Sequence, residues 1–404
     1  MSFQQGLSGL NAASQSLDVI GNNVANANTV GFKDSQAIFA DVYANSLASS
    51  GSTGAGIGVS VASIQAQFSQ GNIRTTSNPL DVAINGRGFF RMDSNGTVNY
   101  TRNGQFHVDK DGYIVNATGS KLTGFGVDAT GNLQIGTAVP IQLSTAQLQA
   151  TATANATVGM NLDARESTIG TAFSITNPAT YNKATSLTVY DSLGNPHALA
   201  TYFTKTAANT WAVNGALDGT SIGALGNLKF KADGSLDTAA SGVPYNISVP
   251  VTDGATTPFV MKLDFSGATQ FGSSFSVDTL KQDGFTSGML SGYAVSDDGT
   301  VLGRYSNGAT RTLGQIQLAN FSNPEGLQPL GQNAFAETAA SGAVIPGTPG
   351  SSNFGVLQSG AVEESNVDLT QELVNMITAQ RVYQANAQTI KTQDQVLNTL
   401  VNLR

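Results

Sequence analysis

Cysteine is absent from the 404 residues of this chain. Its absence excludes disulfide bonds, thiolate metal sites and cysteine nucleophiles, and it is compatible with both oxidising and reducing compartments. Charge is scarce as well, because Asp, Glu, Lys and Arg make up 11% of the residues, against about 25% in a typical soluble protein. Small and amide side chains and 45 glycines fill the chain instead. This composition favours surfaces that pack against copies of the same chain.

Basic charge and long apolar runs are also missing. The net charge is −8 and Lys and Arg form no run, so binding to a phosphate backbone has no electrostatic basis. No stretch approaches 18 apolar residues, and the opening MSFQQGLSGLNAASQSL lacks the basic and apolar regions of a secretory signal. We therefore expect no nucleic-acid partner, no membrane insertion and no export by the secretory route.

Motifs for catalysis, cofactors and metals are not found either. The only two histidines, His107 and His197, each lie in a strand-and-turn run without a second histidine nearby, which favours a structural role. The DKDG turn at Asp109 lacks the remaining ligands of a calcium loop, and GSTGAGIG lacks the Gly-Lys-Ser/Thr ending of a phosphate loop. We expect no enzyme, and no catalytic, cofactor-binding or metal residues.

The two ends of the chain carry apolar residues at intervals of seven. Near the start these are Phe3, Leu10, Leu17 and Val24, and near the end they are Leu369, Met376, Tyr383, Ile390 and Leu397, with Leu373 on the alternate seam. The interval predicts a helix from Ser2 to about Val24 and a second from Asp368 to Asn402, with Asp368 as N-cap and Gln371 completing a capping box.

These ten residues, called the heptad stripe below, predict assembly. A long helix docked on its own domain is the alternative, but a second stripe at the other terminus weakens it. We expect both termini to be loose in the monomer and ordered in the polymer, since a narrow stripe on a detached helix is marginal in water. Gln380 and Asp394 interrupt the alternate seam, which fits a multi-helix array better than a dimeric coiled coil.

The middle of the chain has the pattern of β-structure. Strand-like runs are separated by turns with Asp first and Gly fourth, at 93–96, 109–112 and 128–131. A second such region includes the turn in VYDSLGNPHALATYF, and a third at about 285–335 suggests that the chain returns to the first β domain after an insert. The predicted fold class is mainly β with long helical termini, in a nested multi-domain order.

The predicted division of the chain has four parts. They are a terminal helical core domain (1–30 and 365–404), a connecting region (31–70 and 341–364), an inner β domain (71–145 and 285–340) and an outer β domain (146–284).

Four stretches resemble the bacterial flagellar rod and hook family. They are GNNVANANTVGFK at 21–33, LDVAINGRGFF at 80–90, YTRNGQFHVDKDGYIV at 100–115 and the C-terminal segment from Ser365. The signature residues are Asn22, Asn23, Ala25, Asn26, Thr29, Gly31, Phe32, Lys33, Leu80, Asp81, Gly88, Phe89 and Phe90.

The resemblance implies a structural subunit, and the domain-sized insert favours the hook members of the family over the distal-rod members. Hook members polymerise into a curved, flexible tube that transmits torque from the motor to the filament. Their terminal helices form an inner core around a central channel, and their β domains form outer layers. The implied partners are further copies of the chain, the distal rod protein, the hook cap protein and the hook–filament junction protein. The implied location is the extracellular flagellum, and no cofactor is implied.

The resemblance further implies export through the flagellar type III apparatus. The run from Phe39 to Tyr43 resembles the short motif by which such subunits engage the export gate. As an alternative, the two aromatic residues are one helical turn apart and simply pack together.

Two rival functions stay open at this point. A distal-rod protein shares the terminal motifs but would form a straight shaft. A secreted β-rich adhesin with a helical oligomerisation stalk would account for the β domains, but it would not need the 21–33 segment.

Overall fold

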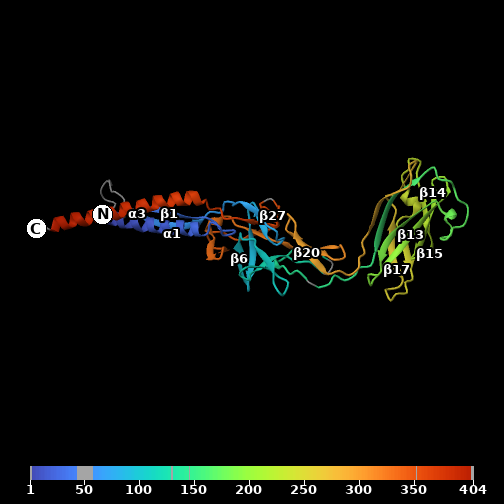
Figure 1. Ribbon diagram of the computed structural model, residues 1–404, viewed down its shortest axis with the longest axis horizontal. Helices are drawn as coiled ribbons and strands as arrows, with labels where there is room; N and C mark the ends of the chain where they lie inside the picture. The colour runs from blue at the N-terminus through green and yellow to red at the C-terminus, as the bar shows by residue number, and fades with distance from the viewer. Residues whose placement is uncertain (1, 43–57, 129–130, 145, 352, 402–404) are drawn as a thin grey trace. The chain divides into compact units, whose positions relative to one another are not determined.

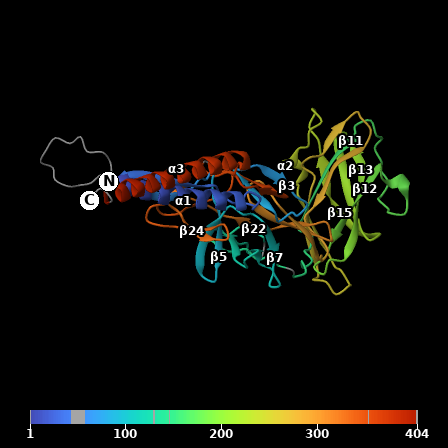
Figure 2. The ribbon, with the colours of Figure 1, turned by 60° about the vertical axis from the view of Figure 1, so that its left-hand side comes forward.

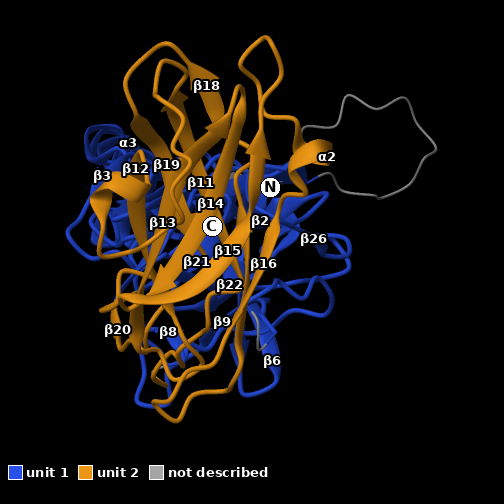
Figure 3. Cartoon of the chain, turned by 90° about the vertical axis from the view of Figure 1, so that its right-hand side faces the viewer, with its two compact units in different colours: residues 1–144, 292–304, 310–404 blue, residues 145–291, 305–309 orange. Residues whose placement is uncertain are grey.

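The computed structural model describes residues 2–42, 58–128, 131–144, 146–351 and 353–401. The chain forms two compact units, coloured separately in Figure 3. Unit 1 comprises residues 1–144, 292–304 and 310–404, and unit 2 comprises residues 145–291 and 305–309. The expected mainly β, multi-domain fold with helical termini is confirmed. None of the helices in the described ranges combines the length and apolar character needed to span a membrane.

The two terminal segments of unit 1 form an antiparallel pair of helices. Helix α1 spans Ser2–Ala25 and helix α3 spans Leu369–Val401, and both views of the ribbon show them side by side (Figures 1 and 2). The predicted helices are thus confirmed. The two helices also pack against each other in the single chain, so neither depends on helix propensity alone; looseness of the termini in the monomer stays a prediction.

The predicted N-cap of α3 is also confirmed. Asp368 Oδ1 accepts the backbone N–H groups of Thr370 at 2.8 Å and Gln371 at 3.2 Å. Among the described residues no hydrogen bond joins the Asp368 N–H to the Gln371 side chain, and the Gln371 amide donates along the helix to Asn375 at 3.0 Å.

Small residues of α1 make the contact with α3. Gly6 and Gly9 lie so close to α3 that a Cβ on Gly6 would be 3.0 Å from Ile390 Cγ1, and one on Gly9 would be 2.8 Å from the Asn386 amide. Ala12 is buried on the same side of the helix, at the spacing of one helical face. The helices therefore approach closely where side chains are small.

A β-hairpin packs on α1. It consists of β1 (Ser35–Val42) and β2 (Gly58–Ala66), paired antiparallel, with a bulge between Ile38 and Phe39. This region was expected as a connection, and the alternation of small, polar and β-branched residues in it explains why it forms strands instead. The loop expected at 45–58 lies almost entirely outside the described residues.

The rest of unit 1 is a β core built from strands before and after the insert. After the insert, β22 pairs with β9 and β23 pairs with β5. The early strands are β3 (Ile73–Thr75), β4 (Val82–Asn85), β5 (Phe89–Ser94), β6 (Thr97–Thr101), β7 (Phe106–Val108), β8 (Ile114–Asn116), β9 (Lys121–Phe125) and β10 (Val139–Pro140). The late strands are β20 (Leu290–Val295), β21 (Thr300–Tyr305), β22 (Thr310–Ile316), β23 (Leu318–Asn320), β24 (Gln328–Gly331), β25 (Ala334–Ala336), β26 (Ile345–Gly347), β27 (Val356–Ser359) and β28 (Ala361–Glu363).

Aromatic side chains fill the centre of this β core. Phe89 meets Phe68 edge-on at 5.1 Å between ring centroids, and Tyr100 meets Phe321 at 4.8 Å. Edge-to-face pairs at such distances add to the stabilisation from burial. The core thus joins residues from both sides of the insert.

Unit 2 contains two sheets around one hydrophobic core. An antiparallel meander runs β12-β13-β14-β15, and a second sheet runs β16-β17-β11-β18, with β19 paired to β11. Trp211, Phe203 and Phe265 are fully buried in the shared core. The elements are β11 (Asn155–Asp163), β12 (Lys183–Tyr190), β13 (Pro196–Ala207), β14 (Thr210–Leu217), β15 (Thr220–Lys229), α2 (Thr238–Ser241), β16 (Tyr245–Val249), β17 (Phe259–Asp264), β18 (Thr269–Phe271) and β19 (Ser276–Gln282).

Replacing Gly9 by Leu tests the close helix contact. The new side chain would enter the space of Asn386, and overpacking of this kind destabilises by roughly 1–3 kcal/mol. Gly21→Leu is the matched control, because no atom lies within 4 Å of a Cβ at Gly21 in the same helix. Thermal unfolding followed by helical circular dichroism should show a lower midpoint for Gly9→Leu than for Gly21→Leu, and equal midpoints would contradict the contact.

Candidate assembly site

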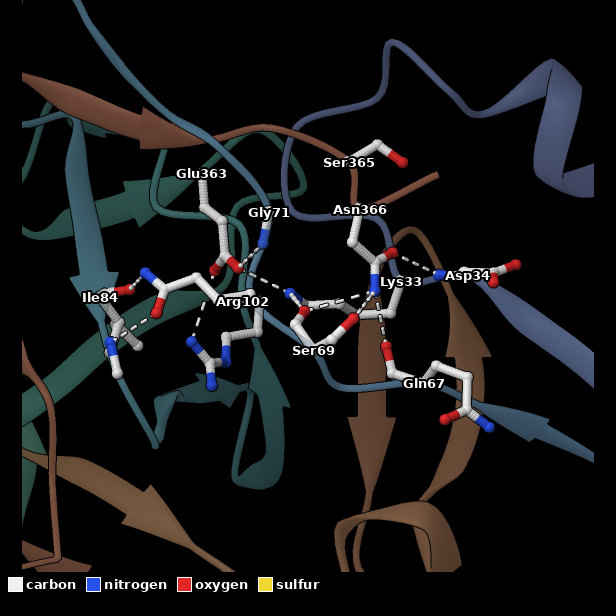
Figure 4. A network of polar contacts seen from close by, with 12 residues as sticks. Lys33, Asp34, Gln67, Ser69, Gly71, Ile84, Arg102, Glu363, Ser365 and Asn366 are labelled. Carbon is white, nitrogen blue, oxygen red and sulfur yellow. Dashed lines mark hydrogen bonds and ion pairs between the residues drawn. The ribbon is translucent and has the colours of Figure 1, made fainter. Parts of the chain in front are cut away.

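A buried group of three charged residues lies where the chain ends meet the β core of unit 1. The Lys33 ammonium donates to Glu363 Oε1 at 2.6 Å and to the Ser69 carbonyl at 2.7 Å. The Arg102 guanidinium donates to Glu363 Oε2 at 3.4 Å, and the Lys33 and Glu363 side chains are fully buried. Figure 4 shows Glu363 between the two cations. We call these three residues the charge junction.

Asn366 forms a second link beside the charge junction (Figure 4). Its side-chain oxygen accepts the Asp34 N–H at 2.7 Å, while its amide donates to the Gln67 carbonyl at 2.8 Å and to Ser69 Oγ at 2.8 Å. The segment that leads into α3 is therefore bonded to the segments on both sides of the β1–β2 hairpin.

Burial is the largest influence on the pKa values of the two cations in the charge junction. Desolvation lowers the pKa of Lys33 even though Glu363 acts in the opposite direction, and the pKa of Arg102 is lowered for the same reason. Arg102 Nε has no hydrogen-bond partner among the described residues. One carboxylate thus serves two buried cations, so removing it would leave uncompensated charge in the interior.

Signature residues place the N-terminal segment against this site. The Gly31 N–H donates to the Glu363 carbonyl at 2.8 Å. Gly31 has φ of +72°, and a Cβ there would be 2.6 Å from the Asn103 nitrogen, so this position requires glycine. Asn23 is buried and both donates to and accepts from the backbone of Ser35.

Most of the other signature residues fall into two groups. Asn22, in the last turn of α1, and Asn26 and Thr29, in the turn after it, form a chain of side-chain hydrogen bonds. Leu80, Phe89 and Phe90 are buried in the β core. Four signature residues belong to neither group. Ala25 is exposed and Phe32 is half-buried. Asp81 accepts a hydrogen bond from Asn78, and Gly88 has a φ of +128°.

Only part of the heptad stripe joins α1 to α3, since Ile390 lies against Gly6 of α1. Phe3, Leu369 and Leu373 are 46%, 42% and 49% exposed. Tyr383 and Leu397 are exposed as well, whereas Leu10, Leu17, Val24, Met376 and Ile390 are half-buried. A straight helix drifts about 20° per heptad relative to a seven-residue repeat, so only part of the stripe can face the partner helix. Unit 1 leaves much of its apolar stripe uncovered.

A groove of about 850 Å³ lies between α1, α3 and the hairpin. Apolar and small residues line most of it, and Asp34 and Glu372 lie in its wall. Glu372 Oε2 is buried without a hydrogen-bond partner among the described residues. Burial, together with the nearby Glu372 charge, raises the pKa of Asp34.

The aromatic pair expected to engage the export gate is only partly described. Phe39 lies in β1, and not in a helix, and is 42% exposed. Tyr43 lies outside the described residues.

Unit 2 contains one group of side chains that sequence reasoning missed. Asp191, Asp218 and Asp253 surround His197. Burial opposes the charged imidazole, but the hydrogen bonds that the imidazole donates to Asp218 and Asp191 outweigh it and raise the pKa of His197. The six-residue spacing from Asp191 to His197 was the available signal, but Asp253 is too distant in sequence to be linked to them by pattern.

Comparison with protein families gives four matches along the chain. Residues 3–33 match the model described as flagella basal body rod protein, and residues 83–189 match the flagellar hook protein FlgE/F/G D1 domain. Residues 161–285 match the flagellar basal body protein FlaE D2 domain, and residues 358–403 match the flagellar basal body rod FlgEFG protein C-terminal model.

Similar full-length proteins include the flagellar hook protein FlgE of Salmonella typhimurium strain LT2, with 46% identity over 100% of both chains. FlgE of Escherichia coli K12 has 46% identity over 100% of both chains, and FlgE of Borreliella burgdorferi has 34% identity over 100% of this chain and 99% of its own. The crystal structure of Helicobacter pylori flagellar hook protein FlgE2 has the same fold, with a TM-score of 0.54 and 14% identity over 72% of this chain and 100% of that chain.

Glu363→Gln tests the charge junction. The substitution leaves Lys33 and Arg102 buried without their carboxylate, and loss of one member of a buried ion pair costs about 3–5 kcal/mol. The neighbouring Glu364→Gln is the matched control, because Glu364 pairs with Arg74 at the surface and such pairs contribute about 0–1 kcal/mol. Denaturant unfolding should separate the two variants by several kcal/mol, and similar losses would mean that the junction does not stabilise unit 1.

Proposed function

Because this chain belongs to the bacterial flagellar hook protein family, we propose that it polymerises with copies of itself into a curved, flexible tube that carries torque from the motor to the filament. The similarity to hook proteins extends over the whole chain, including the insert. It is a structural subunit of the flagellar hook, and this reading is supported over the distal-rod and adhesin alternatives.

Uncovered apolar surface supports the terminal helices as the inner core of the tube. Leu369, Leu373 and Ile377 of α3 follow one another at four-residue intervals and are 42%, 49% and 52% exposed in the single chain. Contiguous apolar surface of this kind marks an interaction site. In the proposed polymer, helices of neighbouring copies cover the stripe, while the charge junction holds each helical pair to its own β core.

The low content of charged residues supports a tube that bends while its neighbouring subunits stay in contact. With 11% charged residues, faces between neighbouring subunits contain few ion pairs that must break and reform as the tube rotates. Neutral polar groups can exchange hydrogen bonds with water or with a new partner at little net free energy. The proposed division of labour is a stiff helical core with sliding β domains outside it.

The proposed assembly has specific neighbours. They are the distal rod protein at one end, the hook cap protein during growth and the hook–filament junction protein at the other end. The proposed route to the cell exterior is the flagellar type III apparatus.

Leu373→Ala tests whether the stripe drives polymerisation. Losing burial of a leucine side chain weakens a contact by about 1.5–3 kcal/mol, so the subunit concentration needed for tubes should rise roughly tenfold or more. Sedimentation and electron microscopy over a concentration series measure this threshold.

Thr392→Ala is the matched control for that experiment, since Thr392 is exposed on the same helix but lies off the stripe. Alanine keeps the helix in both variants, and their circular dichroism should match the parent. The same polymerisation threshold for Leu373→Ala and Thr392→Ala would refute assembly through the stripe.

Phe39→Ala tests recognition by the export gate. An exposed aromatic residue in a strand is available to a partner, so secretion of the variant into the medium should fall several-fold while its folding is unchanged. Ile38→Ala is the control, because Ile38 is the neighbouring residue and is similarly exposed at 38%. Normal secretion of Phe39→Ala would argue against the motif.

A further inference from the structure

Four side chains of unit 2 converge at one end of the meander sheet. His197 is the second residue of β13, Asp191 directly follows β12, and Asp218 directly follows β14. Because β13 pairs with both β12 and β14, these three residues meet at the same sheet end. Asp253 reaches the same imidazole from the loop between β16 and β17.

Each aspartate is oriented by the backbone. In all three, Oδ1 accepts at least one backbone N–H, which leaves Oδ2 directed at His197. The donors are Leu193 and Asn195 for Asp191, Ala198 for Asp218, and Ala255 for Asp253. The carboxylates are therefore held in place before any ligand arrives.

The spacing around His197 Nε2 matches the ligand shell of a metal ion. Nε2 lies 3.3 Å from Asp191 Oδ2 and 3.3 Å from Asp253 Oδ2, and the three ligand atoms all lie within 4.8 Å of one another. A charge-assisted hydrogen bond is shorter, at about 2.7–2.9 Å. Tetrahedral ligands at about 2.0–2.1 Å from zinc are separated by about 3.3–3.4 Å.

The other imidazole nitrogen has the partner that metal-bound histidines require. Nδ1 lies 2.6 Å from Asp218 Oδ2, within hydrogen-bonding distance. A carboxylate in this position keeps the proton on Nδ1 and leaves the Nε2 lone pair for a metal. Asp218 is thus a positioning residue and not a ligand.

Charge favours a divalent ion at this place. Three carboxylates surround one imidazole, and within the described chain all the ion pairs of these aspartates are with His197. Asp191 is fully buried, and the one cationic partner that offsets its charge within the described chain is His197, which Asp253 and Asp218 also face. A divalent ion between the three ligand atoms would offset this negative charge.

We propose that Asp191, His197 and Asp253 bind a divalent transition-metal ion of the zinc class. Imidazole nitrogen and carboxylate oxygen are suitable donors for such ions. The Asn195 amide is 2.9 Å from Asp191 Oδ2 and 3.2 Å from Asp253 Oδ2, so half a turn of that amide would supply its oxygen as the fourth ligand. The ion would connect the β12–β13 turn to the β16–β17 loop.

Calorimetric titration of the chelator-treated full chain with Zn²⁺ tests the proposal. The expected result is one ion per chain, with Asp253→Asn weakening the affinity at least about 100-fold, because asparagine keeps the shape but removes the ligand charge. Asp218→Asn should weaken it about 10- to 100-fold through the orientation of the imidazole. X-ray absorption of the loaded protein should show a histidine nitrogen at about 2.0 Å.

Matched variants separate this site from adventitious binding. His107→Gln removes the other histidine of the chain, and Asp233→Asn removes an exposed carboxylate of unit 2; both should bind Zn²⁺ like the parent. Circular dichroism establishes that each variant is folded. Absence of binding by the parent, equal affinity of folded Asp253→Asn, or loss of binding in His107→Gln would overturn the proposal.

Discussion

The buried contact of Lys33 and Arg102 with Glu363 is the constraint on which unit 1 depends. Lys33 and Glu363 are 330 positions apart in sequence, and Arg102 and Glu363 are 261 apart. Bringing these charges together without water is unfavourable unless all three segments are in place. The junction therefore makes the start of the chain, the β core and the approach to α3 mutually dependent. Asn366 and Gly31 extend the same link through backbone hydrogen bonds.

The two terminal helices use different side chains for their contact with each other and for the apolar surface that they leave exposed. Within the chain they meet through glycine and alanine, which permit close approach and leave little apolar area to cover. Five residues of the heptad stripe remain exposed, namely Phe3, Leu369, Leu373, Tyr383 and Leu397, while Ile390 lies against Gly6. An intramolecular pair built on the whole stripe would have covered the surface proposed for assembly, whereas contacts through small residues leave much of it exposed.

Unit 2 differs from the terminal helices because its apolar side chains are buried within the unit itself. Trp211 and its neighbours are buried between two sheets, and the exposed surface has few large apolar groups compared with α3. The core of unit 2 is therefore complete within one chain. The cluster around His197 lies at the end of one sheet, where turn geometry places carboxylates near one another.

Local patterns in the sequence determined the helices, the main β runs and the turns. Periodicity of seven, an Asp N-cap and Asp-to-Gly turns act over a few residues, so they could be recognised without a structure. The strand at 35–42 was missed because short alternation in a low-charge segment resembles a linker. Only the tertiary structure decided which face of each terminal helix is covered, that Glu363 serves both Lys33 and Arg102, and that Asp253 reaches His197. These three features depend on contacts between residues that are tens to hundreds of positions apart in sequence. Packing and desolvation, and not local propensity, determine the free energy of such contacts.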